Sequence, residues 1–265
     1  MLPFIQLFGF EINMYWLSVA FGIVFACGLA FWRASRSHFN VPVKHVLFTF
    51  LFIILGARVG AVLFKAMGHI FLYATTPDFW TLENWIVLLS SGGVFYGGLI
   101  GGFFAAFAYV KSNKINFQDI SDILMPSIPL FHVFGRMGCF FAGCCHGIQA
   151  DWGIAFSQSI SAPNGIPFIP VQLFEIGLNL WILLVTLILR PERIRQGVLL
   201  PMYLITYSVG RFILEFIRGD MARGIFLLST SQWISVVVLP VAVILLIQTL
   251  KCPRLQCHQS HSLGE

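Results

Sequence analysis

One apolar segment carries ionisable and phenolic residues at helical spacing. Within YSVGRFILEFIRGD, residues 207–220, these are Tyr207, Arg211, Glu215 and Arg218. At about 100° per residue they fall on one helix face, which predicts an Arg211–Glu215 ion pair with Arg218 near the outer end of the helix. Because a guanidinium group binds phosphate through two parallel hydrogen bonds, the pattern favours recognition of a phosphate.

A second apolar segment carries a related pattern. His132 and Arg136 share one helix face, and Pro126 and Pro129 are expected to break the helix on its inner side. Broken helices at membrane depth are tolerated where they line a polar cavity. Asp122 lies about four helical turns from Arg136 and cannot neutralise it directly, so we expect Arg136 to face a ligand or another span.

The composition explains where these residues must lie. Hydrophobic residues make up 58% of the 265 residues and charged residues only 10%, whereas soluble domains average about 25% charged residues. So few charges could not cover a globule of this size, which excludes a soluble enzyme. The net charge of +5 does not indicate nucleic-acid binding, because the cations form short clusters between apolar runs.

Seven apolar segments are long enough to cross a membrane. With the N-terminus outside, the inside loops hold ten Lys and Arg residues and the outside loops three, which predicts a cytoplasmic C-terminus. We therefore expect an all-α integral membrane protein with seven transmembrane helices, at about 14–32, 46–66, 85–110, 122–142, 171–189, 198–217 and 226–250.

The remaining segments are short. The N-terminus has no basic region before its first apolar run, so it is interpreted as a surface arm and not a cleaved signal peptide. Residues 143–170 are rich in turn formers and predict a small extracytoplasmic cap with a short hairpin. We expect one membrane-embedded domain over residues 1–250 and a disordered cytoplasmic tail over 251–265.

Three arginines fall inside predicted spans, namely Arg58, Arg136 and Arg211. A centrally placed Arg costs about 2.5–3.5 kcal/mol on insertion scales, so each requires a partner. Structural ion pairs are one interpretation. Because the spans hold only Glu175 and Glu215 as buried acids, a surplus of positive charge that binds an anionic lipid head group is the favoured one.

The third span contains SSGGVFYGGLIGG, residues 90–102, with six glycines. They allow close helix packing or a backbone that bends around a ligand, and Tyr96 is the informative polar position.

Cysteines gather in another segment, where Cys139, Cys144 and Cys145 precede His146. Free thiols, a disulfide that includes Cys139, and a metal site are all open, although the spacing fits no standard zinc pattern. Cys252 and Cys257 lie on the reducing side and are expected to be inert.

Several motifs occur in one order along nearly the whole chain. They are the N-terminal arm and first span with Tyr15, GARVG (56–60), YGGLIGG (96–102), DILMPSIPL (122–130), GRMGCFFAGCCHG (135–147), PVQLFE (170–175), YSVGRFILEFIRGD (207–220) and LSTSQW (228–233). In these motifs and their spacing the chain resembles bacterial prolipoprotein diacylglyceryl transferases.

The resemblance implies both a fold and an activity. Members have seven spans with the N-terminus outside, and they lie in the bacterial cytoplasmic (inner) membrane with the active site towards the outer face. They move the diacylglyceryl group of phosphatidylglycerol onto the thiol of a lipobox cysteine in the signal peptide of a preprolipoprotein, which releases glycerol phosphate. Besides membrane lipids no further partner is implied, and no metal or organic cofactor.

The resemblance also implies roles for individual residues. Arg136 matches an essential arginine that contacts phosphatidylglycerol, and Arg211 with Glu215 matches a second essential pair. With Tyr96, these are the expected catalytic residues. We also expect a set of substrate-binding residues. It includes Arg136 again, together with Tyr15, Arg58, Gly97, Gly98, Gln172, Glu175, Tyr207 and Arg218.

Three positions depart from the family pattern. Tyr96 stands where the family usually has His, Cys139 where it has Asn, and Ser231 where it has Gly. The usual His is assigned to thiol activation, so Tyr96 is expected to donate a hydrogen bond or to act as a phenolate, with His132 and His146 as possible substitute bases.

The departures leave two alternative functions open. One is a paralogous lipid transferase that uses a different acceptor. The other is a membrane thiol-redox or metal protein that uses the Cys139–His146 cluster.

Overall fold

The computed structural model describes residues 3–7, 9–36, 41–73, 81, 84–86, 95–159, 161–189, 195–219, 224–225 and 228–251. They fall into two compact units, one of Met1–His38 with Ser121–Glu265 and one of Phe39–Ile120. That residues 1–250 form one membrane-embedded domain stays a prediction.

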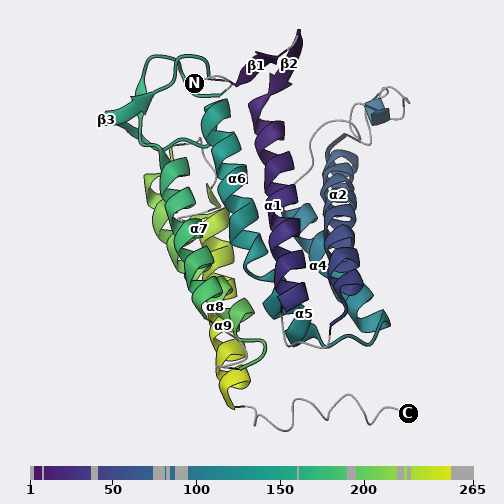
Figure 1. The fold of residues 1–265 in the computed structure, drawn as a ribbon. Coiled ribbons are helices and arrows are strands. Elements are labelled where there is room, and N and C mark those ends of the chain that lie inside the picture. The colour runs from purple at the N-terminus through teal and green to yellow at the C-terminus, as the bar shows by residue number, and fades with distance from the viewer. Residues whose placement is uncertain are drawn as a thin grey trace. The chain divides into compact units, whose positions relative to one another are not determined.

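The larger unit is built around five helices that pack side by side, α1, α6, α7, α8 and α9 (Figure 1). Helix α1 packs along α6, α7 packs against both α6 and α8, and α9 packs against α8. Its helices are α1 (Met14–Arg36), α6 (Ser127–Ala142), α7 (Val171–Ile188), α8 (Leu199–Leu214), the 3₁₀ turn η2 (Glu215–Ile217) and α9 (Thr230–Lys251). Its strands are β1 (Phe4–Leu7), β2 (Phe10–Asn13), β3 (Gln149–Ala155), β4 (Pro167–Phe168), β5 (Gly224–Ile225) and β6 (Leu228–Ser229). Helix α5 (Phe117–Leu124) crosses the boundary between the units.

Small residues let α1 and α6 approach closely. Gly22 lies against the ring of Phe131 and the Cβ atom of Phe134, and Gly138 of α6 lies against Tyr15. The residues that α1 buries recur every fourth position, which is one helical stripe, and they are Ser18, Gly22, Ala26, Ala30 and Ala34. Because lipid gives no hydrophobic drive between helices, such close backbone packing is the main source of their association.

The smaller unit pairs α2 (Val43–Tyr73) with α4 (Phe95–Ser112) through glycines. Gly60 lies against the backbone of Gly97, and Gly56 against that of Gly101, so closely that a Cβ atom on any of them would collide with a carbonyl oxygen. Gly97 and Gly98 are buried in this contact. The packing role weighed for these glycines is thus confirmed, and their role in substrate binding stays a prediction.

Six helical segments of the described chain are long and apolar enough to cross a membrane, so this is a multi-pass membrane protein. They are Met14–Arg36, Val43–Phe71, Phe117–Ala142, Val171–Ile188, Leu199–Ile217 and Thr230–Lys251. The predicted span at 85–110 overlaps α4, but residues 87–94 lie outside the described residues. The count of seven and the outward N-terminus stay predictions.

Proline breaks one span where the sequence predicts it. Helix α5 ends at Leu124, and α6 begins at Ser127 after Pro126, whereas the predicted break at Pro129 is wrong because this residue lies in the first turn of α6. Next to this break, the buried carboxylate of Asp122 accepts hydrogen bonds from the backbone N–H groups of Gly197 at 2.5 Å and Leu199 at 3.1 Å. Asp122 therefore holds the beginning of α8. The expectation that Glu175 and Glu215 are the only buried acids is thus wrong, because Asp122 is fully buried as well.

The described residues form three two-stranded sheets, of which the smallest pairs β5 with β6. The N-terminal arm pairs β1 with β2, and the turn-rich segment after α6 pairs β3 with β4 around an irregularity between Gln149 and Ile154. The predicted hairpin in residues 143–170 is therefore present, and its position on the outer side stays a prediction. The predicted tail lies outside the described residues apart from Lys251, which ends α9.

The glycine contact of the smaller unit yields a prediction. Gly60→Leu should separate α2 from α4 and lower the thermal midpoint of the micelle-bound protein by several degrees, because its side chain would meet the backbone of Gly97. Gly68→Leu is the matched control, since Gly68 lies on the same helix with nothing within 4 Å of a Cβ atom. Equal midpoints for the two variants would contradict this packing.

Candidate active site

Glu175 lies at the centre of a buried ionic network. It belongs to the second turn of α7, which begins directly after Pro170. Its carboxylate pairs with Arg136 of α6, with Arg211 of α8 at 2.6 Å and with Arg218 at 3.5 Å. One carboxylate thus joins three guanidinium groups from different parts of the chain.

Glu215 is the second carboxylate of this network. It pairs with Arg211 at 2.5 Å, as the i, i+4 spacing predicts, and with Arg218 at 3.9 Å. Among the described residues, these salt bridges join three guanidinium groups to two carboxylates. Within the part of the chain that the structure describes, arginines thus outnumber carboxylates in these salt bridges.

The helix does not continue to Arg218, so the predicted single face is wrong for this residue. Helix α8 ends at Leu214, η2 spans Glu215–Ile217, and Arg218 is extended with φ −75° and ψ 136°. Arg218 reaches Glu175 because its backbone forms a β-bridge with Gly147, after α6. A β-bridge, and not the spacing of residues along a helix, therefore determines where Arg218 lies.

Burial distinguishes the three arginines. The side chain of Arg136 is 23% exposed, whereas that of Arg211 is 10% and that of Arg218 is 4% exposed. Arg136 is thus the guanidinium group most open to a ligand. Tyr207 lies near the charges of Arg136 and Arg211, and its ring packs against the ring of His132 at 5.3 Å between centroids.

Two side chains that the sequence analysis did not place in the network also contact it. Ser231, at the beginning of α9, accepts a hydrogen bond from Nη2 of Arg211 at 3.1 Å. Asn179 is buried one turn after Glu175 and donates to its carbonyl oxygen at 2.8 Å. The i, i+4 pair of polar residues inside the apolar helix α7 is the sequence signal that would have found Asn179.

Other expected substrate-binding residues have structural contacts of their own. Gln172 is buried and donates from Nε2 to the carbonyl oxygen of Cys144 at 2.7 Å, while the ring of Tyr15 packs against Gly138. Arg58 is an exposed residue of α2 in the smaller unit. The side chain of Tyr96 lies outside the described residues, so its catalytic role stays a prediction.

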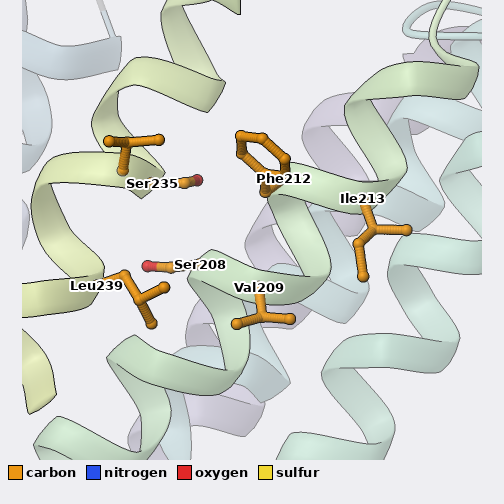
Figure 2. A pocket seen from close by; sticks show the side chains of 7 residues that line it. Ser208, Val209, Phe212, Ile213, Ser235 and Leu239 are labelled. Atoms are coloured by element: carbon orange, nitrogen blue, oxygen red, sulfur yellow. The ribbon is translucent and has the colours of Figure 1, made fainter.

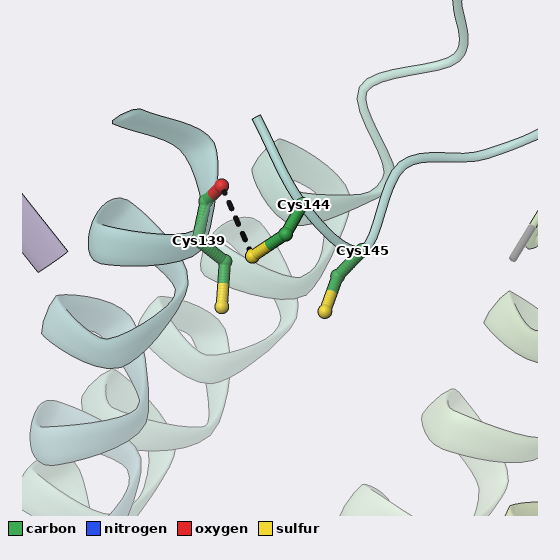
Figure 3. Close-up of side chains that lie close together, drawn as sticks. All are labelled: Cys139, Cys144 and Cys145. Carbon is green, nitrogen blue, oxygen red and sulfur yellow. Dashed lines mark hydrogen bonds between the residues drawn. The ribbon is translucent and has the colours of Figure 1, made fainter. Parts of the chain in front are cut away.

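The thiols of Cys139, Cys144 and Cys145 converge where α6 ends (Figure 3). Their sulfur atoms all lie within 4.8 Å of one another, and the three thiols are free. Hydrogen bonds from the other two thiols, and then the positive charges of Arg218 and Arg136, lower the pKa of Cys145. His146 is not part of this cluster, because its ring packs on Phe168 at 4.2 Å between centroids.

An apolar hollow of 190 Å³ lies between α8 and α9 (Figure 2). Its walls are aliphatic and aromatic apart from the hydroxyl groups of Ser208 and Ser235. Two of its lining residues, Ser208 and Phe212, flank Arg211 along α8. An uncharged hollow next to a charged network suits a molecule with one anionic and one apolar part.

The fold and the network define a class of protein: a multi-pass membrane protein with a buried cluster of arginines around a glutamate. A family profile described as prolipoprotein diacylglyceryl transferase matches residues 3–248. The chain belongs to this family.

Individual relatives agree with the profile. The chain is 31% identical over 239 residues to phosphatidylglycerol--prolipoprotein diacylglyceryl transferase 2 of Clostridium perfringens, a match that covers 88% of this chain and 90% of the relative. It is 32% identical to the enzyme of Clostridium tetani, with 87% and 90% covered, and 34% identical to that of Photobacterium profundum, with 87% and 84% covered.

The central position of Glu175 can be tested through stability. Glu175→Leu leaves three guanidinium groups with the single carboxylate of Glu215, so we expect the free energy of unfolding to fall by about 3–5 kcal/mol. Denaturant unfolding in mixed micelles measures this loss. Glu11→Leu, at an exposed position of β2, is the control and should change stability little. Similar losses for both variants would show that Glu175 does not hold the network together.

Proposed function

We propose that the chain transfers the diacylglyceryl group of phosphatidylglycerol to the lipobox cysteine thiol of a preprolipoprotein and releases glycerol phosphate. The observation that carries this proposal is the convergence of three guanidinium groups on Glu175, in a chain of the prolipoprotein diacylglyceryl transferase family. Relatives that bear the name of this activity match most of the chain.

The reaction forms a carbon–sulfur bond and breaks a carbon–oxygen bond. The thiolate sulfur attacks the primary glyceryl carbon, and the electron pair of the broken bond leaves on the phosphate oxygen. Negative charge becomes concentrated there, so guanidinium groups fixed beside it stabilise the transition state more than the ground state. We assign this role to Arg136 and Arg211, while Glu215 holds Arg211 in position at 2.5 Å.

The acceptor thiol must lose its proton. A free cysteine has a pKa near 8.5, so only a few per cent is thiolate at neutral pH. We propose that Tyr96 donates a hydrogen bond to the phosphate or the thiolate. Of the two histidines weighed as substitute bases, His132 lies beside Tyr207 and close to Arg136, whereas His146 packs on Phe168 and bonds the carbonyl oxygen of Gly147.

The substrates define how the site is approached. Acyl chains enter sideways from the bilayer, and the apolar hollow beside Arg211 supports the placement of an acyl segment between α8 and α9. The signal peptide presents its lipobox cysteine at the outer face of the cytoplasmic membrane. We therefore propose an inner-membrane location with the site open to that face, in line with the charge distribution of the loops.

A second candidate is a lipid transferase with a different acceptor. Its support is that Tyr96 and Cys139 replace the residues usual in the family. Expression in a bacterium depleted of its own transferase separates the two candidates. Rescue supports transfer to lipoproteins, and failure despite good membrane expression supports another acceptor.

The role of Arg136 gives a direct prediction. Arg136→Gln should lower diacylglyceryl transfer at least about 100-fold, because one donor to the leaving phosphate is lost. The measurement incubates purified protein with phosphatidylglycerol and a lipobox peptide, and records the mass increase of the peptide and the release of glycerol phosphate. Arg36→Gln, an exposed residue whose guanidinium group lies over the ring of Trp32, should transfer at the wild-type rate. Equal rates for both variants would remove Arg136 from the reaction.

Ser231 gives a smaller, separate effect. Ser231→Ala removes the hydroxyl group that accepts from Arg211, worth about 1 kcal/mol, so we expect transfer to slow roughly fivefold with little change in stability. Ser35→Ala is the control, because this hydroxyl group only bonds the carbonyl oxygen of Phe31 on an exposed helix face. An unchanged rate in Ser231→Ala would mean that Arg211 holds its position without this contact.

A further inference from the structure

The three-thiol cluster of Cys139, Cys144 and Cys145 has no task in the transfer reaction. The three side chains come from the last turn of α6 and from the loop that follows it (Figure 3). Their sulfur atoms lie within 4.8 Å of one another. A metal–sulfur bond of about 2.3 Å places the sulfur atoms of a trigonal site about 4 Å apart. The thiols are therefore already spaced almost as three ligands of one ion.

The backbone holds this arrangement in place. Gly143 ends α6 with φ 69°, and Cys145 has φ 61°, a left-handed conformation that residues other than glycine rarely adopt. Gly143 and Cys144 are each held through their carbonyl oxygens, by the hydroxyl group of Ser159 at 2.8 Å and by Nε2 of Gln172 at 2.7 Å. The hydrogen bonds and the unusual backbone at Cys145 fix the loop, so the closeness of the three cysteines is a feature of the fold.

The loop is also joined to the ionic network. The N–H group of Gly219 donates to the carbonyl oxygen of His146 at 3.1 Å, and Gly147 forms a β-bridge with Arg218. Cys145 consequently lies in the positive field of Arg218 and Arg136. Charge placed on the thiols is therefore felt by the arginines that would bind a phosphate.

We propose that Cys139, Cys144 and Cys145 bind one thiophilic metal ion, Zn²⁺ or Cu⁺, and that its binding inhibits the transferase. The inhibition rests on the proposed function, whereas the metal site does not. Thiolates are the ligands that select these two ions. Any fourth ligand of Zn²⁺ comes from solvent, because among the described residues the cluster contains only these three ligands.

The charge balance explains the inhibition. On binding, three S–H bonds break, three metal–sulfur bonds form, and three protons pass to the solvent. Zn²⁺ with three thiolates carries a net charge of −1, and Cu⁺ with three thiolates carries −2. Either charge lowers the positive potential at Arg218 and Arg136, so the bound metal competes with the phosphate of the lipid.

A disulfide is the alternative product of this cluster. It would use two of the three sulfur atoms and leave the third as a thiol. A metal ion binds all three sulfur atoms, which agrees better with a cluster in which all three lie close together. The two products differ in mass and in their response to chelators, so the same protein preparation distinguishes them.

The experiment uses the full chain, purified in detergent micelles, reduced, and kept free of oxygen. It is loaded with Zn²⁺ or, separately, with Cu⁺, passed through gel filtration, and analysed for metal per chain and by X-ray absorption. We expect one ion bound by three sulfur atoms at about 2.3 Å. Single Cys139→Ser, Cys144→Ser and Cys145→Ser variants should each weaken binding at least about tenfold, whereas the Cys27→Ser control on α1 should bind as the wild type does.

Two results would overturn the metal site. The first is a wild-type protein that retains no more metal than the Cys145→Ser variant. The second is a disulfide within the cluster that re-forms after reduction in the presence of either ion, seen as a mass loss of about two hydrogen atoms.

The activity arm tests the inhibition separately. Zn²⁺ should slow diacylglyceryl transfer by the wild type at least about tenfold, and it should slow transfer by Cys145→Ser much less. Equal slowing of the two proteins would overturn the proposed inhibition. If the metal-free wild type transfers no diacylglyceryl group, the proposed function fails, and the metal site is judged by the binding data alone.

Discussion

The carboxylate of Glu175 is the interaction on which the rest of the structure depends. It pairs with guanidinium groups from α6, from α8 and from the segment after η2. Removing these arginines from water is costly, and their pairing with Glu175 offsets part of that cost. Among the described residues Glu215 is the second carboxylate of these salt bridges, and the convergence of three arginines supports the proposed binding of a lipid phosphate.

The surrounding structure holds the arginines and glutamates of this network in position. The α1–α6 stripe of small residues positions Arg136, Ser231 of α9 orients Arg211, and the β-bridge at Gly147 brings Arg218 back to the network. The cysteine loop is joined to the same bridge. Lipid phosphate and a thiolate-bound metal would therefore compete for the same positive field, which links the proposed reaction to the proposed control.

Local spacing predicts those parts of the site that lie within one helix or one turn. The Arg211–Glu215 pair, the break at Pro126 and the hairpin after α6 follow from helical periodicity, from proline geometry and from turn formers. The central position of Glu175 does not, because it depends on contacts among three helices. Arg218 could not be placed either, since η2 and a long-range β-bridge end the helical periodicity.

The central claim is that the three converging arginines bind the lipid phosphate. Native mass spectrometry of the micelle-bound protein can measure it, by comparing retention of phosphatidylglycerol with that of phosphatidylcholine of the same acyl chains. The account predicts a preference for phosphatidylglycerol of at least about tenfold in the wild type, and a smaller preference in Arg218→Gln, which removes one guanidinium group of the network. Equal retention of both lipids by the wild type would contradict it.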